Sequence, residues 1–251
     1  MTGSILPWLT IASLAIVAAA LGRVALLVFM LIAAIVAAGE AFRRARTTGV
    51  RPAAFTGMLA IAAFMAVASA RGERAPALQP AIVAAALGAT FAVLMRRKVR
   101  TEVTRALMYT MLPVLVAGFA GSYILSVRAL PDGGLLVLAL VVMVAANEAG
   151  RLVHERFRPG RAWEPFAGGA LLTLVAGVVL GAALEPMTVG RGLAIGALIS
   201  VAAPAGRAVE PLTAVPRPGD RAPLRAPVLA GIGGLLSSAP VFFYAFRALA
   251  R

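Results

Sequence analysis

Long stretches without a charged residue constrain this chain more than any other feature. The windows 24–39, 53–70, 78–95 and 135–146 contain no Asp, Glu, Lys or Arg. Such stretches are typical of helices that cross a bilayer, whose hydrocarbon core is roughly 30 Å thick. Apolar residues make up 61% of the chain, more than one soluble core can bury. The sequence therefore predicts an all-α fold, a polytopic integral membrane helix bundle.

Glycine, proline and arginine residues divide the apolar sequence into nine predicted transmembrane helices. The predicted spans are 5–22, 24–41, 53–70, 78–95, 106–126, 134–150, 166–184, 191–205 and 228–247. The first is interpreted as a retained span and not as a secretory signal, because no basic residue precedes Arg23.

Three expectations follow from the span pattern. Little more than Gly22 and Arg23 separates the first two spans, which predicts a tight helical hairpin. The eighth span is short, which raises the alternative of a broken or partly re-entrant segment. We divide the chain into an N-terminal unit, 1–105, with four helices and basic loops, and a C-terminal unit, 106–251, with five helices.

Basic residues are concentrated in alternate connections. The connections 42–52, 96–105, 151–165 and 206–227 hold 17 of the 24 Lys and Arg residues. Because cytoplasmic loops of membrane proteins are enriched in basic residues, we expect these loops and the N-terminus to be cytoplasmic and the C-terminus to lie on the opposite side. For Arg43, Arg44 and Arg46, a role in topology and a role at a substrate both remain open.

Composition excludes several classes of function. The chain has no cysteine and one histidine, His154, so thiolate metal sites, His clusters and cysteine nucleophiles are absent from the sequence. The net charge of +14 could suggest nucleic acid. The basic residues lie in short juxtamembrane loops without interleaved aromatics, however, where attraction to anionic lipid headgroups explains them.

A few polar and small residues interrupt the apolar spans. Asn147 and Glu148 end the sixth span, and we leave open whether they pack against a neighbouring helix or face a water-filled cavity. For Glu40, at the end of the second span, a structural ion pair is favoured. Gly177 with Gly181 and Gly192 with Gly196 have the spacing that lets helix backbones approach closely, and we interpret them as packing contacts, with a dimer face as the alternative.

The segment 158–169, R-P-G-R-A-W-E-P-F-A-G-G, resembles the S-P-K-K-T-W-E-G-F-x-G-G stretch of the phosphatidate cytidylyltransferases, the CDP-diacylglycerol synthases. Three more segments are similar to this family in the same order. Glu40 followed by 49–52 resembles its Y-E-x-x-R-x-x-x-x-G-x-x-P entry, 206–210 its G-D-L-x-E-S, and 235–244 its L-L-F-A-A-P-V-F-Y. The resemblance implies a helix bundle with a cytoplasm-facing polar cavity, in which family members join CTP to phosphatidate using magnesium.

The departures from this pattern concern the carboxylates. Arg207 stands where the family has the Asp of G-D-L-x-E, and Asn147 where it has the Asp of D-T-G-A-Y. The acidic signature near the C-terminus aligns with 225–234, where Ala230 and Gly233 replace polar positions. Magnesium needs hard anionic oxygen ligands, so these changes remove its expected site.

We therefore expect a catalytically degenerate, CDP-diacylglycerol-synthase-like pseudoenzyme without a metal or cofactor. It would bind an anionic phospholipid such as phosphatidate through Arg161, Trp163, Arg207 and Arg225. The other partners that we expect are a membrane protein or a second copy of the chain. The first alternative is an active transferase with a rearranged magnesium site at Glu148, Glu164 and Glu210. The second is a lipid transporter or scramblase, although the sequence shows no internal repeat of the kind that transporters carry.

Overall fold

The computed structural model describes residues 5–96, 103–157, 164–207 and 227–249. All regular secondary structure in these residues is helical, which confirms the all-α prediction, and nine helical segments lie close to the predicted spans. In chain order the elements are α1 (Ile5–Leu21), α2 (Arg23–Thr47), α3 (Ala54–Arg71), the 3₁₀ turn η1 (Gly72–Ala77), α4 (Gln79–Met95), the continuous run α5–η3–α6 (Val103–Pro113, Val114–Ala120, Gly121–Arg128), α7 (Gly133–Phe157), α8 (Glu164–Ala183), α9 (Val189–Arg207) and α11 (Pro227–Leu249).

Seven of the described helical segments are long and apolar enough to cross a membrane. The segments containing α1 and α4 are apolar but shorter. Many large apolar side chains face outward, such as Phe55 at 82% exposure and Val24 at 75%. An apolar exterior of this extent suits lipid and not water, so the chain is a multi-pass membrane protein.

The predicted hairpin between the first two helices is confirmed. α1 ends at Leu21, α2 begins at Arg23, and the two helices pack against each other. Gly22 alone forms the turn, with φ at 116°. Residues with a Cβ rarely adopt this backbone conformation, so glycine is required here.

Three helices extend beyond their predicted ends. α2 continues from 41 to Thr47, α7 from 150 to Phe157, and α9 spans Val189–Arg207 without a break. The alternative of a broken eighth span is therefore wrong. Gly and Pro lower the intrinsic helix propensity of α9. The glycines of α9 pack closely on α8, and this packing offsets the low propensity.

The long helix α5–η3–α6 changes its hydrogen-bond register in the middle. Pro113 ends α5, and the next turns, Val114–Ala120, are π-helical. Proline has no backbone N–H to donate, so a helix interior containing it cannot keep its regular hydrogen bonds. The chain returns to α-helical geometry at Gly121.

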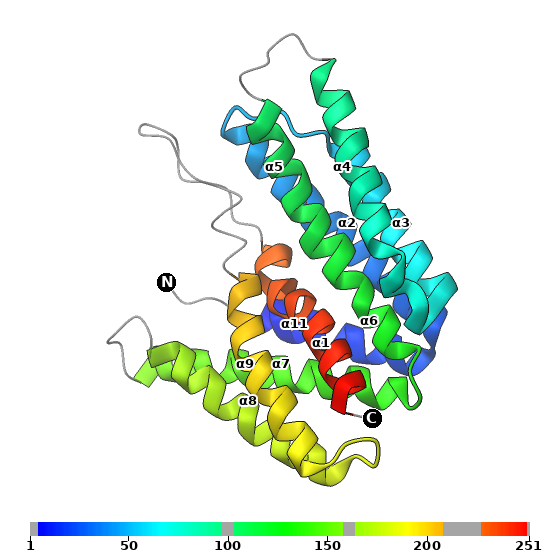
Figure 1. The fold of residues 1–251 in the computed structure, drawn as a ribbon. Helices are drawn as coiled ribbons and strands as arrows, with labels where there is room; N and C mark the ends of the chain where they lie inside the picture. The colour runs from blue at the N-terminus through cyan, green and yellow to red at the C-terminus, as the bar shows by residue number, and fades with distance from the viewer. Residues whose placement is uncertain (1–4, 97–102, 158–163, 208–226, 250–251) are drawn as a thin grey trace.

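The helices form two groups joined by α11 (Figure 1). One group contains α7, α8 and α9, which pack extensively on one another. The other contains α2 to α6. α11 contacts α9 and α7 on one side and α6, η3 and α2 on the other, so it lies at the centre of the bundle.

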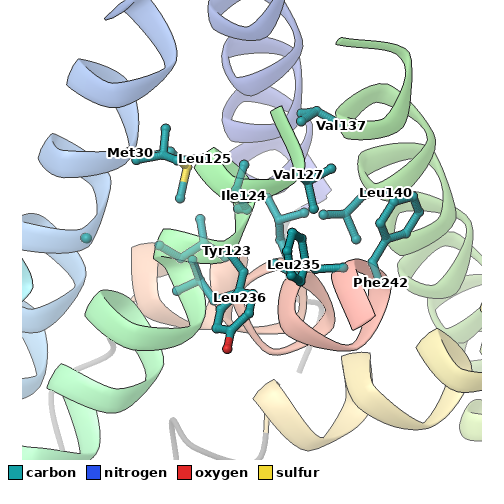
Figure 2. Close-up of a cluster of buried hydrophobic side chains, with 14 of the residues drawn as sticks. Met30, Tyr123, Ile124, Leu125, Val127, Val137, Leu140, Leu235, Leu236 and Phe242 are labelled. Atoms are coloured by element: carbon teal, nitrogen blue, oxygen red, sulfur yellow. The ribbon is translucent and has the colours of Figure 1, made fainter. Parts of the chain in front are cut away.

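The apolar core surrounds this central helix (Figure 2). Leu236 and Phe242 of α11 are fully buried with Leu125 of α6 and Leu140 of α7. Tyr123 joins the same cluster and meets Tyr244 of α11 through their hydroxyl groups at 2.9 Å. The core therefore fixes the position of α11 against both helix groups.

Candidate functional site

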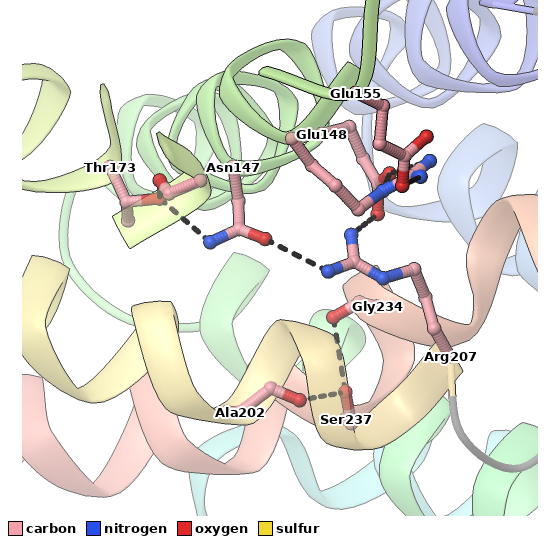
Figure 3. Close-up of polar contacts among 10 residues, drawn as sticks. Asn147, Glu148, Glu155, Thr173, Ala202, Arg207, Gly234 and Ser237 are labelled. Carbon is pink, nitrogen blue, oxygen red and sulfur yellow. Dashed lines mark hydrogen bonds and ion pairs between the residues drawn. The ribbon is translucent and has the colours of Figure 1, made fainter. Parts of the chain in front are cut away.

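A partly buried polar cluster lies where α7, α8, α9 and α11 meet (Figure 3). Its centre is Arg207 at the end of α9, whose Nη1 is paired with Oε1 of Glu148 in α7. Nη2 of the same guanidinium lies 3.4 Å from Oδ1 of Asn147. The side chains of Glu148 and Arg207 are 9% and 17% exposed. Two positions at which the sequence departs from the family pattern, Asn147 and Arg207, are thus in direct contact.

Glu148 has a second cationic partner on its own helix. Nη2 of Arg151 lies 3.2 Å from Oε2 of Glu148, and its Nη1 lies 2.5 Å from Oε1 of Glu155. Because these residues are spaced by three and four positions, they share one face of α7. The four ionised groups of the cluster, two carboxylates and two guanidiniums, balance in charge.

Asn147 links this cluster to α8. Its Nδ2 donates to Oγ1 of Thr173 at 3.0 Å, and the Thr173 hydroxyl donates in turn to the carbonyl of Gly169 at 2.8 Å. Asn147 and Thr173 are both buried. Of the two alternatives for Asn147 and Glu148, packing against neighbouring helices is therefore confirmed.

Glycines bring these helices close enough for the polar side chains to meet. A Cβ on Gly150 of α7 would collide with the carbonyl of Gly168 of α8, and a Cβ on Gly206 of α9 with the carbonyl of Gly233 of α11. Conversely, a Cβ on Gly233 would lie 2.7 Å from the Gly206 carbonyl oxygen. A carboxylate at position 233, where the resemblance implies a polar residue, has no space in this packing.

Glu164 lies at the first turn of α8, as expected for an acid at a helix N-terminus. Its Oε2 is 3.3 Å from Nε2 of His154 on α7. This contact joins the first turn of α8 to the last turn of α7. It does not involve Glu148, which has its own partners on α7 and α9.

Glu40 provides a further polar link, between α2 and α11. Its Oε2 accepts the backbone N–H of Val228 at 3.1 Å, in the first turn of α11. The first N–H groups of a helix lack intrahelical acceptors, so a buried carboxylate there stabilises the helix start. α2 continues past Glu40, and the ion pair expected for this residue remains a prediction.

The cluster around Glu148 does not fit a magnesium ion. Its oxygen donors are Glu148, Glu155 and the amide of Asn147, and the guanidiniums of Arg151 and Arg207 already lie against them. The described residues contain no group of three or more His, Cys, Asp or Glu side chains arranged to hold a metal. A second cation beside Arg207 would be repelled unless that guanidinium moved away.

Several predicted site residues cannot be placed. Arg161, Trp163, Glu210 and Arg225 lie outside the described residues. Arg151 and Thr173, by contrast, are members of the cluster that the sequence analysis missed. The predicted sixth span ends at 150 and leaves Arg151 in a loop, whereas α7 continues to Phe157. The spacing of Glu148, Arg151 and Glu155 by three and four residues is itself typical of a helix.

Comparison with known proteins agrees with the resemblance noted in the sequence. The cytidylyltransferase family matches residues 3–211, which is most of the chain. The uncharacterized protein YnbB of Escherichia coli K12 is 29% identical over 131 residues, covering 46% of this chain. This chain spans only 43% of the length of YnbB. The extent of the family match shows that the chain belongs to the cytidylyltransferase family.

Proposed function

We propose that this protein is a catalytically degenerate member of the cytidylyltransferase family that binds an anionic phospholipid. The observation that carries the proposal is the Arg207–Glu148 ion pair. At a position where the resemblance calls for a carboxylate, the chain has a cation, and this cation neutralises the neighbouring acid. Nucleotidyl transfer between two polyanions depends on a metal that bridges phosphate oxygens, and the described cluster holds guanidiniums in the place of such a metal.

The packing of α9 against α11 is a second, independent support. The backbones of Gly206 and Gly233 are in contact. A glycine at position 233, where the resemblance implies a polar residue, therefore allows α9 and α11 to cross closely. Restoring a carboxylate at position 233 would require the helices to separate. The loss of the acidic signature therefore involves the packing of α9 against α11 as well as the identity of the side chains.

Arginine can still recognise a phosphate in this arrangement. Glu148 and Asn147 engage one terminal nitrogen each, which leaves Arg207 with further N–H groups to donate, because a guanidinium carries five. The described cluster is balanced in charge, so additional attraction for an anionic headgroup must come from other residues. We assign that role to Arg161 and Arg225, together with Trp163, which follows Arg161 by two positions in the sequence.

The catalytic part of the proposal is tested by assaying the purified protein with CTP, phosphatidate and magnesium. We expect no CDP-diacylglycerol above a membrane blank, while an active phosphatidate cytidylyltransferase assayed in parallel gives product. Magnesium-dependent turnover that is abolished by Glu164→Gln or Glu210→Gln would overturn the proposal and favour an active enzyme with a rearranged metal site.

The binding part is tested by native mass spectrometry with phosphatidate and with phosphatidylcholine. Arg161→Gln combined with Arg207→Gln should weaken phosphatidate binding at least tenfold and leave phosphatidylcholine binding nearly unchanged. Because Arg207→Gln also breaks an ion pair, Arg161→Gln and Arg225→Gln are measured as single variants. If all variants bind both lipids as the wild type does, the headgroup site is wrong and a role in binding a partner protein is favoured.

A further inference from the structure

A groove between α2 and α3 is separate from the polar cluster of α7, α8 and α9. Its volume is about 300 Å³, and it is lined by Val36, Gly39, Phe42, Arg43 and Arg46 of α2 and by Ala54 and Met58 of α3. This volume is at the lower end of the range typical of ligand pockets. None of the residues that surround Glu148 contributes to it, so the groove is a distinct candidate site.

The α2 side of the groove is apolar at one end and basic at the other. Val36, Gly39, Arg43 and Arg46 are spaced by three or four residues, so they follow one face of the helix. From Val36 to Arg46 this face is about 15 Å long at 1.5 Å per residue. That length is about half of the roughly 30 Å hydrocarbon core, which is the depth of one lipid leaflet.

The groove is continuous with an apolar outer face. Val24, Val28 and Ile32 precede Val36 at intervals of four residues along α2, and all of them are exposed by 42% or more. On α3, which contributes Ala54 and Met58 to the other wall, the neighbouring Phe55 is 82% exposed. A ligand that enters from this face comes from the hydrocarbon of the bilayer and therefore carries an apolar chain.

The charges at the basic end are available to a ligand. Arg43 and Arg46 are both exposed, and within the described part of the chain no hydrogen bond or ion pair joins either guanidinium to another residue. No carboxylate is among the residues that line the groove. Glu40, on the same helix, is buried and accepts the backbone N–H of Val228 on α11.

We infer that this groove binds an anionic phospholipid, with its phosphate between Arg43 and Arg46 and one acyl chain along Gly39 and Met58. Two arginines spaced by one helical turn form charge-assisted hydrogen bonds with phosphate oxygens. Arginines that only set topology require no apolar groove beside them. The coincidence of the groove, the outward apolar face and the two cations favours a lipid over a soluble anion.

The test uses the full-length protein in detergent, titrated with phosphatidylglycerol and observed by native mass spectrometry. Arg43→Gln combined with Arg46→Gln should weaken binding of phosphatidylglycerol at least tenfold. The matched control is Arg71→Gln with Arg74→Gln, which removes two exposed arginines at the same spacing at the other end of α3 and should leave binding unchanged.

A second variant tests the acyl chain without changing any charge. A Cβ at Gly39 would meet only Cε of Met58 at 4.0 Å, so a side chain at this position begins in open space and Gly39→Leu extends into the groove. It should also weaken phosphatidylglycerol binding at least tenfold. Gly88→Leu on α4, where a Cβ meets nothing within 4 Å, is the matched control and should have no effect.

The outcomes separate a lipid groove from other sources of the same signal. Loss of binding in both test variants, with inorganic phosphate in excess unable to displace the lipid, supports the inference. Loss only in the double arginine variant, or displacement by inorganic phosphate, would show a simple anion patch and overturn it. Equal binding of phosphatidylglycerol and phosphatidylcholine by the wild type would overturn it as well. The same titrations are repeated in an Arg161→Gln background, which weakens the headgroup site of the proposed function. Phosphatidylglycerol binding that remains there and is lost with Arg43→Gln and Arg46→Gln belongs to the groove, so the two proposals can fail separately.

Discussion

Arg207 at the end of α9 forms an ion pair with Glu148 of α7, which lies 59 residues earlier in the chain. The pair joins two helices of the group that contains α8, and Asn147 extends the contact to Thr173 of α8. Three helices are therefore held together by a polar network at one end of the bundle.

Removing the cation of this pair should destabilise the protein. Arg207→Gln leaves a carboxylate that is 9% exposed with Arg151 as its remaining partner. Breaking a fully buried pair costs roughly 3–5 kcal/mol, and we expect about 2 kcal/mol here because Arg151 and partial solvent access reduce the penalty. Thermal unfolding in detergent measures the change. Arg191→Gln, at the other end of α9, is the control, and a double variant with Glu148→Gln should recover part of the loss.

Exchanging the cation for an acid should create sensitivity to magnesium. Arg207→Asp removes the guanidinium that pairs with Glu148 and adds a carboxylate on the facing helix α9, so the net charge of the cluster becomes more negative by two. We expect the variant to be less stable than Arg207→Gln without metal and to gain several degrees in melting temperature with millimolar magnesium. The wild type should show no such gain. An equal response of both proteins would contradict the idea that Arg207 excludes the metal.

The contact between α8 and α9 should not tolerate a larger side chain. A Cβ on Gly192 would collide with the carbonyl of Gly177, and the two helices meet through these glycines. Overpacking typically costs about 1–3 kcal/mol, and we expect Gly192→Val to be at or above the upper end because its neighbour is backbone. Gly190→Ala is the control, since a Cβ there meets nothing within 4 Å. A stable Gly192→Val variant with an altered oligomeric state would instead favour the dimer face.

The topology can be tested by labelling single cysteines in intact cells, since the chain has no native cysteine. Thr47 and Pro131 are exposed and are separated by α3, α4 and α5–η3–α6. Three crossings put them on opposite sides, and the concentration of basic residues predicts that Thr47 is cytoplasmic. Thr48 is only 7% exposed and is less suitable for labelling. Labelling of both positions from one side would contradict the predicted number of spans.

The helical class and the approximate spans could be predicted from the sequence because both depend on local properties. Charge-free apolar windows require helices in a bilayer, since hydrocarbon offers no partners for backbone N–H and C=O groups. The predicted helix ends were less accurate, since α2 and α7 extend several residues beyond them. A helix ends where its hydrogen bonds end, and charged residues such as Arg44 and Arg151 continue it past the apolar stretch.

The sequence by itself also identified Asn147, Glu148 and Arg207 as unusual, because a polar residue in an apolar span and a cation in place of a carboxylate are visible without a structure. It could not show that they are neighbours. Only the tertiary structure decided this, through the close glycine contacts that bring α7, α8, α9 and α11 together. Side-chain contacts between helices depend on the rotation and crossing of each pair, and these are set by packing across the whole bundle and not by any local pattern.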